Sequence, residues 1–121
     1  RANEVNLEMP KYIAQRVAKD IGGSLEGKKV LVVGVTNKPN VADTRETPAE
    51  LLIDALKDLG AVVSWNDPVV GSWHGKESAG LNGAEIAVVV TKHDVVSAED
   101  ILKSAPYVFD TTGKVKGAVQ L

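Results

Sequence analysis

The chain has 121 residues, enough for one ordinary domain with a buried core, and its 44% hydrophobic and 25% charged residues are typical of a soluble globular protein. The net charge of −2 provides no basic field for nucleic acid or an anionic membrane surface, and no apolar run approaches the roughly 20 residues of a membrane span. Cysteine is absent and the two histidines lie far apart, which excludes disulfides, thiolate metal sites and a cysteine nucleophile and argues against a histidine metal site.

The first predicted element is a helix over residues 2–21. Its apolar residues recur at spacings of three and four and form one stripe, made of Val5, Met9, Tyr12, Ile13, Val17 and Ile21. Pro10 lies inside this pattern and cannot donate a backbone hydrogen bond, so we expect a kink or a restart of the helix there. The glycine-rich residues 22–27 then end the helix and form a linker.

A strand and a helix follow. KKVLVVGV, residues 28–35, is an unbroken aliphatic run, which indicates a strand buried on both faces, as in a parallel sheet. TPAELLIDALKDLG, residues 47–60, predicts the next helix. Thr47 is the expected N-cap, Pro48 occupies the first helical position, Glu50 completes a capping box and Gly60 is the C′ residue. The expected buried face of this helix consists of Leu52, Ile53, Leu56 and Leu59.

The second half of the chain continues the alternation. AVVSWNDP, residues 61–68, predicts a second strand, and residues 69–83 are irregular with one helical turn near 77–81. AEIAVVVT, residues 84–91, predicts a third strand, and YVFDTT, residues 107–112, a fourth. Between them Ser97 caps a short helix that ends near Ser104, with Asp100 at the capping-box position.

This order predicts an α/β fold: a Rossmann-like parallel sheet with right-handed crossovers and helices on both faces, preceded by an N-terminal helix. Ligands on such sheets bind outside the carboxyl ends of the strands. Here those ends are residues 34–47, 66–69, 91–94 and 110–113.

The loop after the first strand carries charges instead of glycines. Gly34 permits a tight exit, but a G-x-G-x-x-G pattern is missing, which disfavours a complete NAD site. Lys38 and Arg45 form a cation pair before a helix N-terminus, an end that favours anions by about 0.3–1 kcal/mol at exposed sites. With Asp43 holding Arg45, these residues describe a phosphate site that needs no glycines. They also fit an ordinary solvated turn with surface charges.

Four further residues have two interpretations each. Asp67 occupies the place of the ribose-binding acid of dinucleotide domains, although an Asp before Pro at a strand end is commonly a turn former. His93 either faces the cleft or is a polar surface histidine. Trp65 and Trp73 could stack on a base, but Trp65 lies within a strand and fits the core better.

At the level of motifs, GVTNKPNVADTRETPA, residues 34–49, resembles the signature of the UDP-glucose/GDP-mannose dehydrogenase family. It is most similar to the branch of UDP-N-acetylmannosamine dehydrogenase-like members, in which a GxxYKPNxxDxRESPA pattern follows the first strand of the C-terminal domain. NEVNLEMPKY, residues 3–12, is similar to a segment of the long central helix of that family, and WNDPVV and VVVTKHD match its later strand ends. The resemblance spans nearly the whole chain.

The resemblance implies an NAD-dependent oxidoreductase of polysaccharide biosynthesis, cytoplasmic and homodimeric, which oxidises the C6 alcohol of a UDP-sugar to a carboxylate in two steps. It implies that residues 1–22 are the C-terminal part of the central dimerisation helix and that residues 28–121 are the UDP-binding domain. Lys38 and Asn37 would then bind the UDP-sugar, while Arg45, oriented by Asp43, would reach toward NAD. The NAD itself would be held mainly by an N-terminal domain, and neither nucleic acid nor membrane is an expected partner.

Two positions depart from the family pattern. Asn37 stands where an aromatic residue is common, and Thr112 and Gly113 stand where an arginine usually follows the last strand, so one substrate-side cation and the identity of the sugar are open. Because the chain starts at Arg1 and lacks both the NAD fingerprint and a cysteine, we expect an excised C-terminal domain that binds UDP weakly and does not oxidise.

The alternative is a non-enzymatic Rossmann-like interaction module that dimerises through its N-terminal helix, whose apolar stripe would be an adhesive surface. A complete small NAD-binding protein is disfavoured by the missing glycines.

Overall fold

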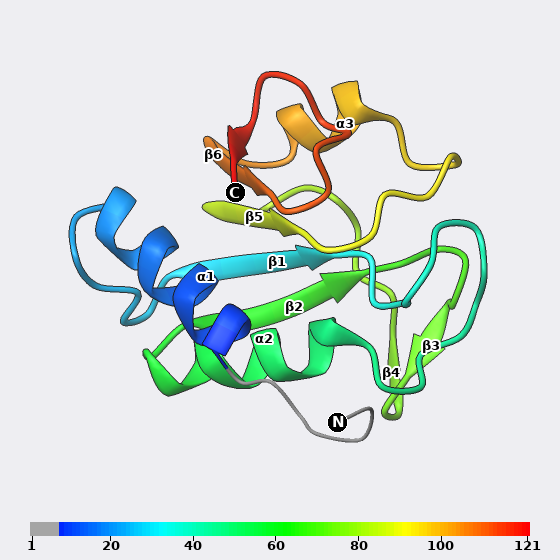
Figure 1. Ribbon diagram of the computed structural model, residues 1–121, viewed down its shortest axis with the longest axis horizontal. Helices are drawn as coiled ribbons and strands as arrows, with labels where there is room; N and C mark the ends of the chain where they lie inside the picture. Colours follow the sequence, from blue (N-terminus) through cyan, green and yellow to red (C-terminus); the bar gives the residue numbers. More distant parts are fainter. Residues whose placement is uncertain (1–7) are drawn as a thin grey trace.

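The computed structural model describes residues 8–121, so the start of the predicted N-terminal helix, including Val5, lies outside the described residues. Within them, five strands form a parallel sheet in the order β2-β1-β5-β6-β7 (Figure 1). Their bounds are β1 Lys29–Val33, β2 Val62–Asn66, β5 Ile86–Val89, β6 Tyr107–Asp110 and β7 Val119–Gln120. The helices are α1 Glu8–Asp20, α2 Pro48–Asp58 and α3 Ala98–Lys103. The predicted Rossmann-like α/β fold is confirmed, and β7 adds a short strand that was not predicted.

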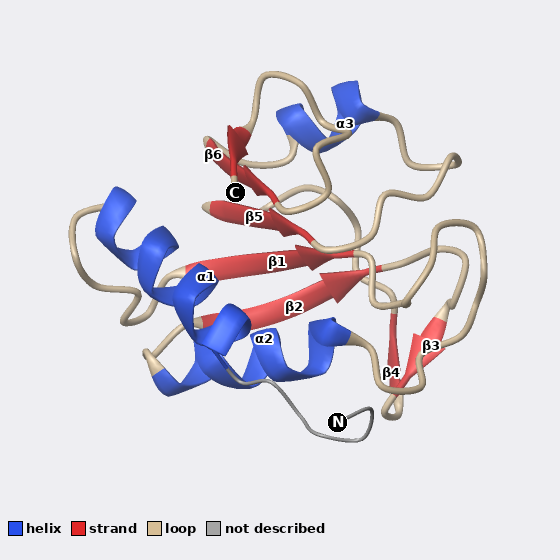
Figure 2. Ribbon diagram, in the orientation of Figure 1, coloured by secondary structure: helices blue, strands red, loops and turns tan. Residues whose placement is uncertain are grey.

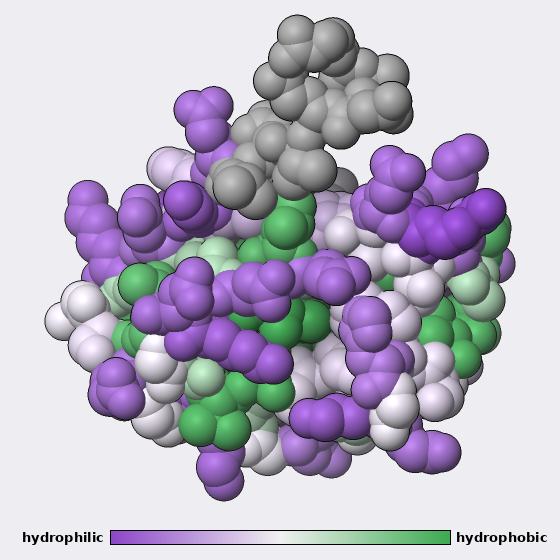
Figure 3. Space-filling model, turned by 90° about the horizontal axis from the view of Figure 1, so that it is seen from below, coloured by the Kyte–Doolittle hydropathy of each residue, from purple (hydrophilic) through white to green (hydrophobic). Residues whose placement is uncertain are grey.

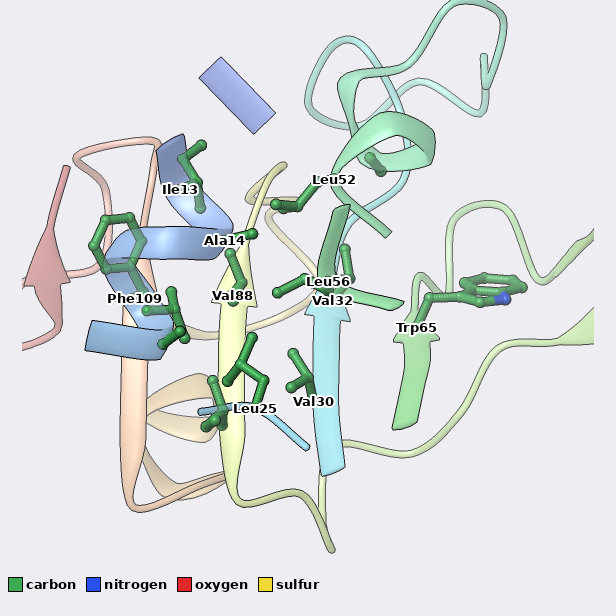
Figure 4. Packing of buried hydrophobic residues seen from close by; sticks show 14 of the residues in the cluster. Ile13, Ala14, Leu25, Val30, Val32, Leu52, Leu56, Trp65, Val88 and Phe109 are labelled. Carbon is green, nitrogen blue, oxygen red and sulfur yellow. The ribbon is translucent and has the colours of Figure 1, made fainter. Parts of the chain in front are cut away.

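The two faces of the sheet are covered by different helices (Figure 2). Alternate residues of a strand point to opposite faces, so β1 contributes Val30 and Val32 to one core and Leu31 and Val33 to the other. The first core includes buried residues of α1 and α2, and Figure 4 shows them turned toward the sheet. The second core includes Ile101 of α3. Both faces of β1 are therefore buried, as its aliphatic run predicts.

Helix α1 is part of the domain core, but its buried side differs from the predicted stripe. The buried residues are Pro10, Ile13, Ala14, Val17 and Ala18. Met9 and Tyr12, which were expected in the stripe, are 49% and 51% exposed. Pro10 stands in the first turn of the described helix. Amides in a first turn have no helical carbonyl to donate to, so the missing N–H of Pro10 breaks no hydrogen bond of the described helix. The linker is also anchored, because Leu25 is buried beneath the helix layer.

The caps of α2 and α3 agree with prediction, with one correction. The Thr47 hydroxyl accepts a hydrogen bond from the Ala49 amide at 3.2 Å, and the Ser97 hydroxyl accepts one from the Asp100 amide at 3.0 Å. The predicted capping box with Glu50 is wrong, since the Glu50 carboxylate lies 3.5 Å from Nε2 of His74.

The end of α2 also departs in part from the expected pattern. Gly60 follows the helix with a φ of +92°, as a C′ residue requires. Leu52 and Leu56 are buried as expected, Ile53 is partly buried, and Leu59 is 36% exposed because it stands at the C-cap, past the last turn that faces the sheet.

The segment between β2 and β5 forms a β-hairpin, so the predicted helical turn near residues 77–81 is wrong. Strands β3 Ser72–Trp73 and β4 Lys76–Glu77 pair antiparallel. The two residues between them, His74 and Gly75, have φ values of +53° and +75°, which is the geometry of a tight type I′ hairpin turn. Trp73 meets the buried Trp65 edge to face at 5.7 Å, so Trp65 belongs to the core as expected.

The face of the molecule at the lower side of Figure 1 is mostly hydrophilic. Figure 3 shows charged and polar residues over most of this face, with hydrophobic residues in small separate groups. No helix of the described chain is long and apolar enough to cross a bilayer. Residues 8–121 also contain no group of three or more side chains suited to hold a metal ion.

Candidate functional site

The candidate site is the loop of residues 34–47, which leaves β1 at the carboxyl edge of the sheet. Gly34 has a φ of +87°, and a Cβ built there would lie 2.2 Å from the carbonyl oxygen of Thr91. The Thr91 hydroxyl also donates to the Thr36 carbonyl at 2.5 Å. Gly34 is therefore required because the loop passes against the exit of β5. It does not form part of a phosphate cradle.

The loop is tied to the end of β5 a second time through Asn40. The Asn40 amide donates to Nδ1 of His93 at 2.8 Å, and Oδ1 of Asn40 accepts from the Asp94 amide at 2.8 Å. His93 is only 1% exposed, so the interpretation of His93 as a surface histidine is wrong. Its polar ring atoms are satisfied inside the protein instead.

Asp67 provides the other partner of His93. This carboxylate is fully buried, and its Oδ2 contacts both Nε2 of His93 and the Val35 amide at 2.8 Å. Its Oδ1 accepts from the amides of Val69 and Val70, each at 3.0 Å. The turn-forming interpretation of Asp67 is confirmed. The carboxylate already accepts four hydrogen bonds, which leaves no capacity for a ribose hydroxyl.

The charged residues that the sequence singles out lie together on this loop. Asp43 and Arg45 form a bidentate ion pair. Nε of Arg45 donates to Oδ1 of Asp43 and Nη2 of Arg45 donates to Oδ2, both at 3.0 Å. The Asn37 side-chain amide donates to the Arg45 carbonyl, which closes the loop across the pair. Lys38 is exposed, and among the described residues its ammonium forms no ion pair.

The ion pair shifts the pKa of both partners in the direction that favours their charged forms. Hydrogen bonds from the Arg45 side chain, with a smaller contribution from its backbone amide, lower the pKa of Asp43 to about 2. The same contact raises the pKa of Arg45. The Arg45 side chain is nevertheless 87% exposed, so its guanidinium is oriented by Asp43 while most of its surface faces solvent.

The helix N-terminus contributes less to an anion site than its position suggests. Thr47 is 3% exposed, and its hydroxyl already accepts from the Ala49 amide, one of the first amides of α2. An anion on this loop would therefore be held chiefly by the side chains of Lys38 and Arg45.

The last strand end is self-contained. Asp110 is fully buried, and its Oδ1 accepts from the amide and the hydroxyl of Thr112 at 2.8 and 2.7 Å. Its Oδ2 accepts from the Val115 amide at 2.8 Å. The position at which the family pattern has an arginine is thus occupied by a residue that closes a turn around Asp110.

Two cavities lie near the sheet edges, and neither is lined by the charged loop residues. One, of about 350 Å³, lies between α2 and the hairpin, with Trp65, Trp73 and His74 in its wall. The other, of about 310 Å³, is apolar and lies between the first turns of α1 and α2, beside Val90 and Thr111. Lys38 and Arg45 line neither of these cavities, and both residues are exposed.

The described residues do not fit a complete dinucleotide site. Gly34, the single glycine at the exit of β1, packs against Thr91, and the carboxylate oxygens of Asp67 already accept hydrogen bonds from within the protein. The arrangement offers the Lys38 ammonium, which is unpaired within the described part of the chain, and the oriented Arg45 guanidinium, on a loop whose backbone is tied to two neighbouring strand ends. That is suited to contact a phosphate or another anion from one side.

A parallel sheet with helices on both faces defines a Rossmann-like domain, and the loop after its strand β1 carries Lys38 and Arg45 together with two acidic residues, Asp43 and Glu46. The chain belongs to the UDP-glucose/GDP-mannose dehydrogenase family, because the model of that family's UDP binding domain matches residues 31–117.

Relatives support this membership. The chain is 34% identical to a UDP-N-acetyl-D-mannosamine dehydrogenase of Methanococcus maripaludis, over 91% of this chain and 29% of that protein. A UDP-glucose 6-dehydrogenase of Rhizobium meliloti is 39% identical over 53% of the chain and 15% of that protein.

A solved structure agrees with the fold. The UDP-N-acetyl-mannosamine dehydrogenase Cap5O from S. aureus superposes with a TM-score of 0.73 at 28% identity, over 93% of this chain and 28% of that one. The chain thus spans less than a third of the length of these relatives.

Sequence reasoning found the charged group but missed its anchor. Lys38, Asp43 and Arg45 fall within eight residues, so their proximity follows from the chain itself. The contact of His93 with Asn40 joins residues 53 positions apart. The only signal for it was that both follow predicted strands and so share the carboxyl edge of the sheet.

Proposed function

We propose that this chain is the UDP-sugar-binding C-terminal domain of an NAD-dependent nucleotide-sugar 6-dehydrogenase. The whole protein would oxidise the C6 alcohol of a UDP-sugar to a carboxylate. The observation that carries the proposal is the exposed Lys38, which has no ion pair within residues 8–121 and stands beside the Asp43–Arg45 pair on a loop tied to the carboxyl edge of the sheet. Membership of a family whose model is a UDP binding domain supplies the class of ligand.

Lys38 is proposed to contact the diphosphate of the UDP-sugar. Its ammonium has no ion pair among the described residues, so binding a phosphate there breaks no existing contact. Asn37, which the resemblance also assigns to the substrate, uses its amide to close the loop onto the Arg45 carbonyl. Asn37 would therefore support the site by holding the loop closed around Lys38.

Arg45 is proposed to act at the boundary with another domain. Asp43 fixes the direction of its guanidinium, and the 87% exposed side chain projects away from this domain. A side chain in this state is available to an N-terminal domain of the same protein that holds NAD. The chain contains no cysteine, so the residues present here would bind and orient the substrate and would leave the oxidation to that domain.

The interaction-module alternative loses its main support. Ile13 and Val17, the centre of the stripe proposed as an adhesive surface, are 6% and 0% exposed because they pack in the core of this domain. Homodimerisation of the whole protein and its cytoplasmic location remain part of the proposal. Met9 and Tyr12, half exposed on α1, are the residues through which the helix would meet a second copy.

A UDP titration of the 121-residue chain tests the proposal. At millimolar UDP we expect amide chemical shifts of residues 35–46 to change, with Lys38→Gln weakening binding about tenfold through loss of one charge-assisted contact. The matched control is Lys19→Gln, because Lys19 lies far from the loop, at the end of α1. Its neighbour Asp20 contacts Tyr107 at the start of β6, which is the amino edge of the sheet and opposite the proposed site. Unchanged shifts around residues 35–46, or equal weakening by both variants, would count against the proposal.

A further inference from the structure

We propose that His93 is the positioning residue of the UDP-binding loop: it holds Asn40 in place and thereby fixes Lys38, which touches the ligand. This inference rests on the proposed function for its ligand, and on the hydrogen bonds of the loop for its geometry. His93 lies 1% exposed beyond the carboxyl end of β5, and no described contact brings its ring to the solvent-facing side of the loop.

The protonation of His93 follows from its two partners. Nδ1 accepts from the Asn40 amide at 2.8 Å, so Nδ1 carries no proton. The proton is therefore on Nε2, which donates to Oδ2 of Asp67 at 2.8 Å. A buried carboxylate thus selects the tautomer that can accept a hydrogen bond from the loop.

One carboxylate oxygen of Asp67 holds the loop on both sides of Lys38, at Val35 directly and at Asn40 through His93. Its Oδ2 accepts directly from the Val35 amide at the start of the loop, at 2.8 Å. The same oxygen reaches Asn40 through His93. Lys38 lies between these two ties, and its own carbonyl accepts from the Thr36 hydroxyl at 2.9 Å. The backbone on both sides of Lys38 is consequently anchored to the buried interior.

Asn40 is suited to this role by its conformation. Its φ of +66° lies in the left-handed region, which asparagine tolerates better than most residues. In that conformation its amide points to His93 while Oδ1 accepts from the Asp94 amide at 2.8 Å. These contacts fix the loop without using the side chain of Lys38, which forms no ion pair among the described residues.

The consequence for binding is preorganisation. A loop already held in its binding conformation loses less conformational entropy when a ligand arrives, so affinity rises without any new contact to that ligand. Removal of the Nδ1 contact should release the segment around Asn40 and leave Lys38 chemically intact. The effect on UDP affinity would then act through the loop alone.

Two substitutions of His93 separate positioning from plain structural support. In His93→Asn, the side-chain oxygen occupies the place of Nδ1 and can still accept from Asn40, while the contact with Asp67 is lost. In His93→Gln, the side-chain NH2 occupies the place of Nε2 and can still donate to Asp67, while the acceptor for Asn40 is lost. Both variants replace the buried ring of His93 by a smaller carboxamide. If His93 only supports the structure, the two variants should weaken UDP binding to a similar extent.

The experiment measures the UDP dissociation constant, the thermal unfolding midpoint and backbone 15N relaxation of residues 36–42 in the 121-residue chain. We expect His93→Gln to weaken UDP binding about tenfold and to increase the mobility of that segment. The loss of a single hydrogen bond changes a binding constant by about that factor. His93→Asn should stay within about threefold of the parent chain. Equal weakening by both variants, or ligand-free loops as rigid as the parent, overturns the proposal.

A second pair of variants avoids the buried position. Asn40→Asp keeps the side-chain acceptor and the left-handed conformation, and should retain binding. Asn40→Gly keeps the conformation and the amide but loses the contact with Asp94, and should weaken UDP binding by a smaller factor than His93→Gln. Unchanged binding in both Asn40→Gly and His93→Gln contradicts the positioning role.

The ligand-free measurements distinguish the two proposals. If the parent chain fails to bind UDP, the proposed function is overturned, and relaxation of residues 36–42 in His93→Gln still decides whether His93 holds the loop. In the parent chain, a 15N shift of His93 Nδ1 typical of an unprotonated acceptor supports the tautomer on which the inference depends. A protonated Nδ1 overturns it.

Discussion

Two buried aspartates end two strands of the same sheet, and they are used in different ways. Asp67 follows β2 and Asp110 ends β6, and both are 0% exposed. Among the described residues, every hydrogen-bond donor to the Asp110 carboxylate lies within five positions along the chain, in the turn that leads to Val115. Asp67 has two such local partners, but it also reaches Val35 and His93, which are 32 and 26 positions away.

The comparison shows that the location of the donors, more than the buried carboxylate itself, decides the role. A buried carboxylate requires several donors to offset its desolvation. Where the following turn supplies them all, the residue shapes one turn. Where some donors come from other strand ends, the same group joins three segments at the carboxyl edge of the sheet, the edge at which α/β sheets in general bind ligands. The two residues should therefore differ in how far the effect of their removal spreads.

Removal of Asp67 is expected to have the largest effect. Asp67→Ala should lower the free energy of unfolding by about 4 kcal/mol, since it leaves His93 and three backbone amides without a buried acceptor. Urea denaturation measures the loss, and amide shifts measure its reach. We expect changes at Val35 and Asn40 as well as at residues 68–70. Changes confined to residues 66–71 would contradict the long-range role, and Asp67→Asn, which keeps one acceptor, should lie between.

Gly34 tests the close approach of the β1 and β5 exits on which the long-range contacts depend. Gly34→Ala should cost about 3 kcal/mol, because its φ is +87° and the added Cβ would lie 2.2 Å from the Thr91 carbonyl oxygen. The matched control is Gly71→Ala, since Gly71 has a φ of +79° but no atom within 4 Å of its Cβ position. It should show the conformational cost alone, about 1 kcal/mol. Equal losses in urea denaturation would show that contact with Thr91 contributes nothing.

The same distinction explains what the sequence could predict. The N-caps Thr47 and Ser97 and the turn after Asp67 depend on partners two or three residues away, and all were predicted. The Asp43–Arg45 pair is equally local. The roles proposed for Lys38 and Arg45, in contrast, depend on the resemblance to a family, because a charged loop alone also fits a solvated turn.

The failures are long-range or very short elements. The surface interpretation of His93 fails because nothing near His93 in sequence indicates that Asp67 and Asn40 enclose it. The hairpin β3–β4 and strand β7 have two-residue strands, which are too short for a periodic pattern. The exposure of Tyr12 depends on which side of α1 meets the sheet, and that is decided by packing that the helix sequence does not contain.

Removal of Asp110 should have a smaller and more local effect. Asp110→Ala is expected to lower the free energy of unfolding by about 2 kcal/mol, because the buried Val115 amide and the Thr112 contacts lose their acceptor. Amide shifts should change in residues 111–121, including β7, and stay unchanged in residues 34–47. Thr112→Val removes the hydroxyl that donates to Asp110 at 2.7 Å and accepts from the Lys114 amide at 3.1 Å, and it should cost about 1 kcal/mol. A change of UDP affinity in Asp110→Ala would show that this turn also supports the site.

Asp43 provides the smallest expected effect on stability, because this third aspartate and its partner Arg45 lie at the surface. The pKa of Asp43 is lowered from 3.8 to about 2 by hydrogen bonds from Arg45. Since the pKa in the folded chain is below that of the unfolded chain, the contribution of the pair is complete above about pH 4 and is lost as pH falls toward about 2. Near neutral pH the pair therefore orients Arg45 without any pH dependence.

A carboxyl 13C titration of Asp43 measures this directly. Arg45→Gln should return the pKa of Asp43 toward 3.8, whereas Lys38→Gln should change it less, because Lys38 is the weakest of the causes and acts through charge alone. An Asp43 that titrates at its ordinary value in the parent chain would mean that the guanidinium is not held in solution. Arg45 would then lose the fixed direction on which its proposed role at the domain boundary depends. Lys38 would keep its role, since His93 and Asn40 hold that part of the loop independently of Asp43.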